Sequence, residues 1–214
     1  MKKIILMIIM LFICLVNVYA KEEGSLIKNA RAGVLIDASS GEVLYEKNKD
    51  HEVAVASMTK MVAQIIILEN IEKGNLKWDD VITVSKNASG MGGSQIYLQT
   101  GEKMTVRDLM KGITMASAND ATVAMAEAIS GTEDDFVKLM NKKVKEIGLK
   151  NTVFKNSTGL DEEGHYSSAL DMARIAKELL SHEQILEFSS VYEDYLRKDT
   201  PNKFWLVNTN KVVY

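Results

Sequence analysis

A serine and a lysine three positions apart are the side chains of this chain that could best do covalent chemistry together. They are Ser57 and Lys60, in the segment Ser57-Met58-Thr59-Lys60. A serine hydroxyl is a weak nucleophile until a neighbouring base accepts its proton. A lysine can be that base only if its pKa is lowered, and burial lowers it by disfavouring the charged form. The spacing therefore predicts a nucleophile and its base, provided that the segment is helical and buried.

The residues that follow favour such a helix. Residues 58–73 are apolar on nearly every face and end at Gly74, which predicts a helix in the middle of a domain. Spacing alone decides little, because 15 Ser and 22 Lys in 214 residues give about 1.5 such matches by chance. The second match, Ser25–Lys28, has no apolar helix behind it. Context therefore favours Ser57.

A second candidate pair is Ser117 and Asn119, between expected helices at 106–116 and 120–130. A hydroxyl can relay a proton, and an amide can donate and accept hydrogen bonds. Serine and asparagine are also favoured helix caps. The same pattern recurs at Ser85–Asn87. The residues alone leave catalysis and capping open.

The remaining pattern is mostly helical. Val34–Ile36 and Val43–Tyr45 flank a turn that ends in glycine and predict a β-hairpin, with no other strand convincing. Residues 151–165 read as a long loop, and the segment after Pro201 as a strand or a helix. Capping-box patterns predict three more helix starts: Thr105 with Asp108 before 106–116, Thr132 with Asp135 before 133–147, and Ser168 with Asp171 before 169–181.

The N-terminus predicts export. Two lysines precede an apolar run, and Val18-Tyr19-Ala20 supplies small residues before a cleavage point, so residues 1–20 are expected to be a signal peptide and 21–214 the domain. The alternative is an uncleaved membrane anchor. A net charge of −3 is too small to indicate a nucleic-acid partner, and a single Cys excludes a disulfide framework or a Cys-based zinc site. The three histidines show no metal-ligand spacing and are expected at the surface.

Taken together, the motifs resemble the low-molecular-weight penicillin-binding proteins, in particular the serine-type D-alanyl-D-alanine carboxypeptidases. The resemblance covers most of the chain after residue 20. Its motifs are Ala56–Lys60, Ala116–Ala121, Gly159–Asp161, Gly164–Ala169, Asp171–Ala173 and Asn208–Asn210.

The resemblance implies an α+β, β-lactamase/transpeptidase-like fold, with an antiparallel sheet and a helical cluster. It also implies that Ser57 attacks the bond between the two terminal D-alanines of a peptidoglycan stem peptide and that Lys60 takes its proton. Ser117 would relay a proton to the leaving D-alanine, and Asn119 would help to hold the substrate and Lys60. Water would release the acyl group, β-lactams would acylate Ser57, and no metal or organic cofactor would be needed.

The sequence departs from the family in two places. Val55 stands where the family usually has proline, and no Lys-Thr-Gly motif is present. We therefore expect a catalytic domain truncated before that strand, with an incomplete sheet and without the C-terminal region that associates with the membrane. The alternatives are a remnant that only binds peptidoglycan peptides, a serine β-lactamase, and a helical binding module.

Overall fold

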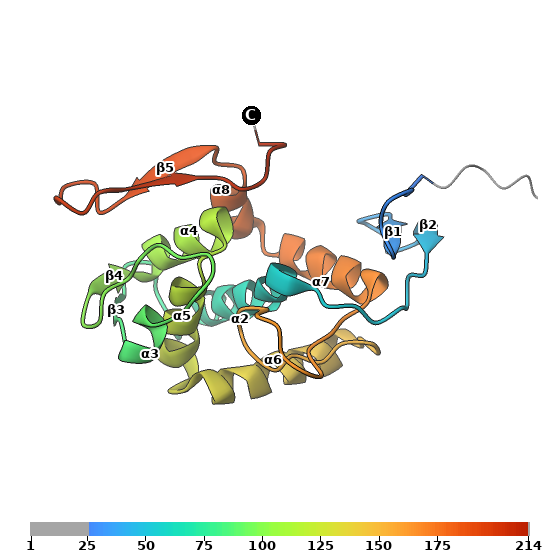
Figure 1. The fold of residues 1–214 in the computed structure, drawn as a ribbon, viewed down its shortest axis with the longest axis horizontal. Coiled ribbons are helices and arrows are strands. Elements are labelled where there is room, and N and C mark those ends of the chain that lie inside the picture. The colour runs from blue at the N-terminus through green and yellow to red at the C-terminus, as the bar shows by residue number, and fades with distance from the viewer. Residues whose placement is uncertain (1–25, 214) are drawn as a thin grey trace, which may run out of the picture. The chain divides into compact units, whose positions relative to one another are not determined.

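A computed structural model describes residues 26–213 of the chain (Figure 1). The chain divides into two compact units, residues 1–31 and 32–214, and all helices and strands of the described residues belong to the second. The predicted signal peptide, residues 1–20, lies outside the described residues. Within the described part, no helix has both the length and the apolar character that a membrane crossing requires.

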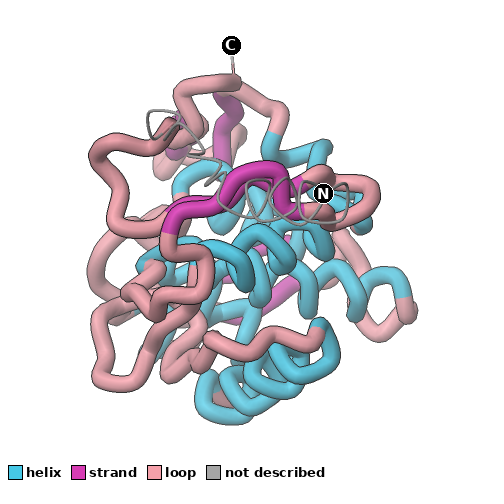
Figure 2. Tube along the Cα trace, turned by 90° about the vertical axis from the view of Figure 1, so that its right-hand side faces the viewer, coloured by secondary structure: helices cyan, strands magenta, loops and turns pink. Residues whose placement is uncertain are grey.

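Helices form most of the second unit. The central one is α2, which contacts α4, α5, α6 and α7 and is apolar on nearly all of its faces. Figure 2 shows the long loops gathered along one side of this helical cluster. The long helices are α2 (Lys60–Glu72), α4 (Val106–Ala116), α5 (Asn119–Ser130), α6 (Glu133–Ile147) and α7 (Ala169–Ser181), and the short ones are η1 (Ala56–Thr59), α3 (Lys86–Ser89), η2 (Glu183–Ile185) and α8 (Leu186–Ser189).

Side-chain caps start three of these helices where the sequence predicted them. The hydroxyls of Thr105, Thr132 and Ser168 accept hydrogen bonds from the backbone N–H groups three residues later, at 3.1, 3.1 and 3.2 Å. Each satisfies one of the N–H groups that a helix start leaves without an internal partner. The predicted bounds of α4, α6 and α7 are confirmed.

The strands are short and antiparallel. They pair as β1 (Gly33–Ile36) with β2 (Val43–Lys47), β3 (Val81–Thr83) with β4 (Lys103–Thr105), and β5 (Glu193–Leu196) with β6 (Phe204–Val207). The predicted hairpin is confirmed as β1–β2, and the segment after Pro201 forms a strand. The expectation of only two strands was wrong, and the strands of residues 26–213 form three two-stranded sheets instead of one.

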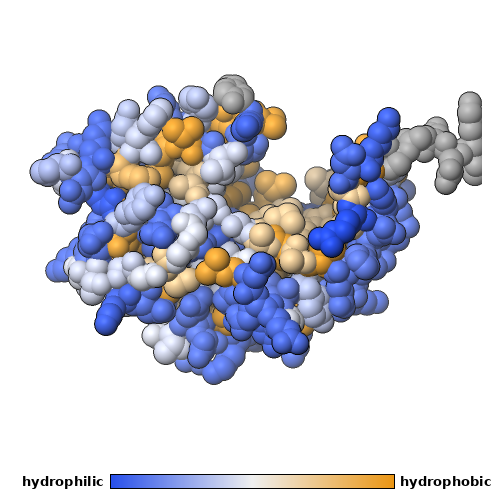
Figure 3. Space-filling model, viewed as in Figure 1, coloured by the Kyte–Doolittle hydropathy of each residue, from blue (hydrophilic) through white to orange (hydrophobic). Residues whose placement is uncertain are grey.

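The core lies between the helices, where α2 contributes buried Val62, Ile65, Ile67 and Leu68. Figure 3 shows hydrophilic side chains over most of one face, while hydrophobic ones gather toward its middle. Because α2 runs through this core, its first residue, Lys60, is also 3% exposed. The fold therefore buries the base candidate through the helix to which it belongs.

Candidate active site

The Ser57 hydroxyl and the Lys60 amine meet at the point where η1 passes into α2. The distance between Lys60 Nζ and Ser57 Oγ is 3.0 Å. Ser57 is exposed, whereas Lys60 is buried. The predicted spacing thus gives a reachable hydroxyl with an amine behind it, away from water.

Among the described residues, Lys60 Nζ has one further hydrogen-bond partner, the backbone carbonyl of Thr158, at 2.7 Å. Burial lowers the pKa of Lys60 to about 8. About a tenth of the lysine is then neutral at pH 7, compared with less than a thousandth for a lysine in water. With one N–H directed at Thr158, the neutral amine can present its lone pair to the Ser57 hydroxyl.

A loop between α6 and α7 supplies the Thr158 carbonyl. The side-chain oxygen of Asn156 accepts hydrogen bonds from the N–H groups of Thr158 and Gly159, at 3.2 and 2.8 Å. Ser157 donates its hydroxyl to Glu133 Oε1 at 2.7 Å. These bonds fix the loop against α6 and give the carbonyl a defined position.

Gly159 places this loop directly on the turn that carries Ser57. Its φ is +84°, and a Cβ added there would lie 1.9 Å from the carbonyl oxygen of Ala56. Only glycine fits such an approach. Ala56 itself has a φ of 46°, which is costly for a residue with a side chain and is typical of functional sites.

His165 contacts the turn that carries Ser57 through a hydrogen bond to Thr59. The Lys155 N–H donates to His165 Nδ1 at 3.2 Å, so the ring proton sits on Nε2, which lies 2.8 Å from Thr59 Oγ1 and donates to it. Burial lowers the pKa of His165, which favours this neutral form. The expectation of surface histidines was wrong for His165, which is 8% exposed, and for His182, which is 9% exposed.

Asn119 lies at the first position of α5, next to a glycine turn. Its Nδ2 donates to the Gly92 carbonyl at 2.7 Å, and its Oδ1 is buried without a hydrogen-bond partner among the described residues. A Cβ on Gly93 would lie 2.8 Å from Asn119 Nδ2 and 3.8 Å from Leu160 Cδ2. The turn at residues 92–94 thus lies between Asn119 and the loop that touches the Ser57 turn.

Ser117 is half-buried and ends α4 in the left-handed conformation, with a φ of 56°. Ser117 is the C-cap of α4, and its backbone N–H donates to the Gly112 carbonyl, so the capping interpretation is confirmed for the Ser117 backbone. It is wrong for the side chains, because α5 has Ala118 as its N-cap and no side-chain capping bond. In the part of the chain that the structure describes, no hydrogen bond joins the pair to Ser57 or Lys60.

Comparison with known proteins now decides the family. The family model described as D-alanyl-D-alanine carboxypeptidase, peptidase family S11, matches residues 19–214. The chain belongs to this family. The expected resemblance is confirmed, and the helical binding module was the wrong alternative.

Two curated carboxypeptidases illustrate the similarity. DacF of Bacillus subtilis is 54% identical over 209 residues, which are 96% of this chain and 54% of DacF. DacA of Escherichia coli K12 is 38% identical over 193 residues, or 87% of this chain and 47% of DacA. The chain thus spans about half the length of these carboxypeptidases.

Solved structures confirm the fold of the family. Penicillin-binding protein 5 from Haemophilus influenzae superposes with a TM-score of 0.80 at 34% identity, over 86% of this chain and 53% of that one. DacD from Francisella tularensis gives 0.76 at 38% identity, over 78% and 41%. The predicted α+β, penicillin-binding-protein fold is confirmed.

One buried carboxylate of this carboxypeptidase-family chain was not predicted from the sequence. Asp120, 1% exposed, accepts hydrogen bonds from the N–H groups of Ile96 and Leu98, at 3.2 and 3.0 Å. It thereby holds the segment that begins at the 92–94 turn. Its only sequence signal is its place beside Asn119, because an acidic residue in a first helical turn is common at the surface.

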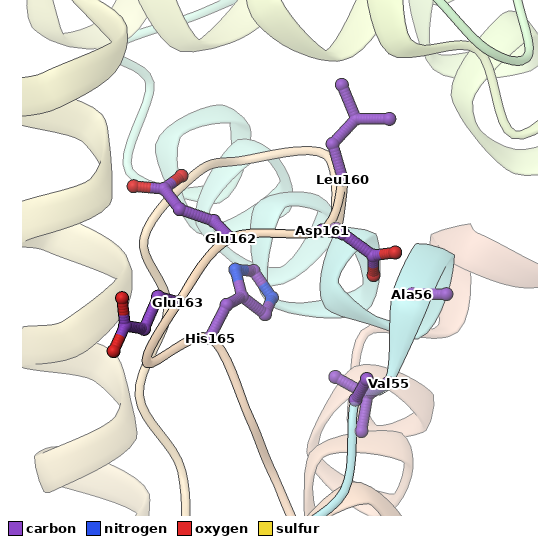
Figure 4. Close-up of a pocket in the computed structure, with 9 residues that line it drawn as sticks. Val55, Ala56, Leu160, Asp161, Glu162, Glu163 and His165 are labelled. Carbon is purple, nitrogen blue, oxygen red and sulfur yellow. The ribbon is translucent and has the colours of Figure 1, made fainter.

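A cavity of about 340 Å³ opens beside the turn that carries Ser57 (Figure 4). Ser57 is not among its lining residues, but the preceding Ala56 is. Opposite lie the side chains of the 159–165 loop, with His165 turned toward the space between the two segments. The complete lining is Ala54, Val55, Ala56, Gly159, Leu160, Asp161, Glu162, Glu163 and His165.

Proposed function

We propose that this chain carries out the acyl-transfer chemistry of a serine D-alanyl-D-alanine carboxypeptidase on peptidoglycan stem peptides. The observation that carries the proposal is the contact between Ser57 and Lys60. An exposed hydroxyl 3.0 Å from a buried amine, whose pKa is lowered to about 8, is the combination that an activated serine needs. The names of its relatives DacF and DacA supply the substrate class.

In the first step, Ser57 Oγ attacks the carbonyl carbon of the penultimate D-alanine while its proton passes to Lys60 Nζ. The C–N bond then breaks, and the terminal D-alanine leaves after its amine receives a proton through Ser117. The amide of Asn119, whose Oδ1 has no partner among the described residues, would accept a substrate N–H. Water then cleaves the ester, which returns the hydrogen to Ser57 and releases the shortened peptide.

β-Lactams would acylate Ser57 by the same attack, because their strained amide replaces the D-alanyl-D-alanine bond. Since the substrate lies in the cell wall, the protein would act on the outer side of the cytoplasmic membrane. The signal peptide predicted at residues 1–20 would take it there.

Labelling by fluorescent penicillin tests the first step. The purified chain should gain one label, detected on a denaturing gel and as the mass of one penicilloyl group. Ser57→Ala should lose the label, whereas Ser39→Ala, in the exposed hairpin turn, should keep it. An unlabelled wild-type chain, or a label that survives Ser57→Ala, would refute the proposal.

Release of D-alanine from a pentapeptide tests the complete reaction. Ser117→Ala should slow the release of D-alanine more than a hundredfold. Ser85, in the other Ser-x-Asn pattern, caps α3, and Ser85→Ala should keep the rate of release within a few-fold of that of the wild type. Label without release would indicate a chain that acylates but does not turn over. Rapid hydrolysis of the penicillin instead would indicate the β-lactamase alternative.

A further inference from the structure

Two glutamates and a histidine gather where the last turns of α2 and α7 meet. They are Glu69 on α2, Glu178 on α7, and His182, which directly follows α7. One potential ligand atom from each residue lies within 4.8 Å of the other two. Glu69 is nine residues beyond Lys60, or about 13 Å along the helix, so this cluster is separate from the Ser57 site.

His182 supplies the observation that points to a ligand. The side chain is 9% exposed, and its Nδ1 lies 2.8 Å from Glu72 Oε1. A carboxylate at Nδ1 favours the N–H on that atom, which leaves a lone pair on Nε2. Nε2 is buried and has no hydrogen-bond partner among the described residues. Metal-binding histidines are commonly oriented in this way, by a carboxylate on the nitrogen that does not bind the metal.

A metal ion can displace the two lysines that pair with Glu69. Lys143 and Lys73 bind the two oxygens of Glu69, at 2.5 and 3.0 Å. Lys143 has a second partner in Glu146, at 2.7 Å, and the side chain of Lys73 is 63% exposed. Glu178 makes no ion pair within the described part of the chain. Its carboxylate therefore needs no release before it can bind a metal.

We propose that Glu69, Glu178 and His182 bind a divalent transition-metal ion of the zinc type, and that Glu72 orients His182. Zinc accepts imidazole nitrogen and carboxylate oxygen at about 2.0–2.2 Å, which sets tetrahedral ligand atoms roughly 3.4 Å apart. The ligand atoms lie within 4.8 Å of one another, so the side chains must close by up to about 1.4 Å, and water would complete the coordination. A nitrogen ligand favours zinc over magnesium or calcium, which prefer oxygen alone.

Such an ion would link α2 to α7 and stabilise the fold without taking part at Ser57. Metal-free chain, prepared by EDTA treatment, is titrated with zinc chloride by calorimetry and with cobalt chloride by visible absorption. We expect one zinc per chain and cobalt bands typical of nitrogen and oxygen ligands. The temperature of unfolding should rise by roughly 5–10 °C at a zinc concentration a hundredfold above Kd. Magnesium chloride should produce no such rise.

Variants locate the site. His182→Gln and Glu178→Gln should each lose the stoichiometric binding and the rise in the unfolding temperature. Glu183→Gln, a change at the exposed acid beside His182, should retain both. Glu72→Gln should weaken zinc binding about 10- to 100-fold. If His182→Gln does not fold, the loss of zinc binding in Glu178→Gln tests the site instead. Wild-type chain without stoichiometric zinc, or binding that survives Glu178→Gln, would overturn the proposal.

Discussion

Gly159→Ala is the substitution that most directly tests how the loop at residues 156–160 controls Ser57. The added methyl group would lie 1.9 Å from the carbonyl oxygen and 2.4 Å from the carbonyl carbon of Ala56, the residue before Ser57. It would also lie 2.9 Å from Thr59 Oγ1. These neighbours are the backbone and a short side chain of the turn that carries Ser57, so the two segments must separate.

The separation can be worked out from the contact. A carbon and an oxygen normally approach no closer than about 3.2 Å, so the Ala56 carbonyl must withdraw by more than an ångström. A displacement of about 1 Å between reacting groups costs roughly a hundredfold in rate. The left-handed φ of +84° adds about 1–2 kcal/mol to the cost of folding, because alanine adopts it poorly. We therefore expect acylation of Ser57 to slow at least a hundredfold and stability to fall by about 3 kcal/mol.

Gly164→Ala is the matched control. Gly164 lies in the same loop with a φ of +80°, but among the described residues a Cβ there meets only the end of the flexible Lys155 side chain, with Cε at 3.0 Å and Nζ at 3.8 Å. This variant should lose about 1–2 kcal/mol of stability, because alanine adopts the left-handed φ poorly. Its acylation rate should stay within a few-fold of that of the wild type. Acylation is followed by fluorescent penicillin under conditions where circular dichroism shows both variants folded, and stability by urea unfolding. Folded Gly159→Ala that acylates at the wild-type rate would refute the reasoning.

Three further predictions concern titration and buried hydrogen bonds. If Lys60 is the base, the acylation rate of Ser57 should rise with pH around 8. The free energy of unfolding should also rise between pH 8 and 10.5, because in that range Lys60 is protonated only in the unfolded state. Lys60→Met should flatten that rise. His165, whose pKa is lowered by burial, should make the fold less stable as pH falls below 6.5, and His165→Gln should remove that loss. Asp171→Ala should cost about 3 kcal/mol in urea unfolding, because the buried carboxylate accepts bonds from two backbone N–H groups and a threonine hydroxyl, whereas exposed Asp161→Ala should stay within about 0.5 kcal/mol.

The helices could be predicted because their signals are local. Thr105, Thr132 and Ser168 each form the capping bond expected from the residue three positions later. The strands β3, β4 and β5 could not be predicted, because each has only three or four residues, and the pattern of β6 left a strand or a helix open. Such short segments are strands because of their partners, and pairing leaves no periodic pattern in either one.

The part of the candidate site that lies within one helical turn could be predicted from the sequence. Ser57 and Lys60 meet because they are three residues apart. The surroundings of Lys60 come from the carbonyl of Thr158, 98 residues away, and a backbone carbonyl has no sequence signal. The burial of His165 depends likewise on contacts with Thr59 and with the Lys155 backbone, and its spacing from other histidines says nothing of them.

The two Ser-x-Asn patterns show what a structure adds to a motif. At the first, the hydroxyl of Ser85 accepts a bond from the Ala88 N–H at 2.9 Å and caps α3, so capping already occupies the serine. At the second, no capping bond occupies the Ser117 hydroxyl, the N-cap of α5 is an alanine, and Asn119 Oδ1 has no partner in the described part of the chain. A buried amide oxygen without a hydrogen-bond partner destabilises the fold by about 1–3 kcal/mol, and a ligand that donates a hydrogen bond to it would offset this cost. Local hydrogen bonds therefore separate two patterns that share the Ser-x-Asn spacing, and they favour a substrate as the partner of the second.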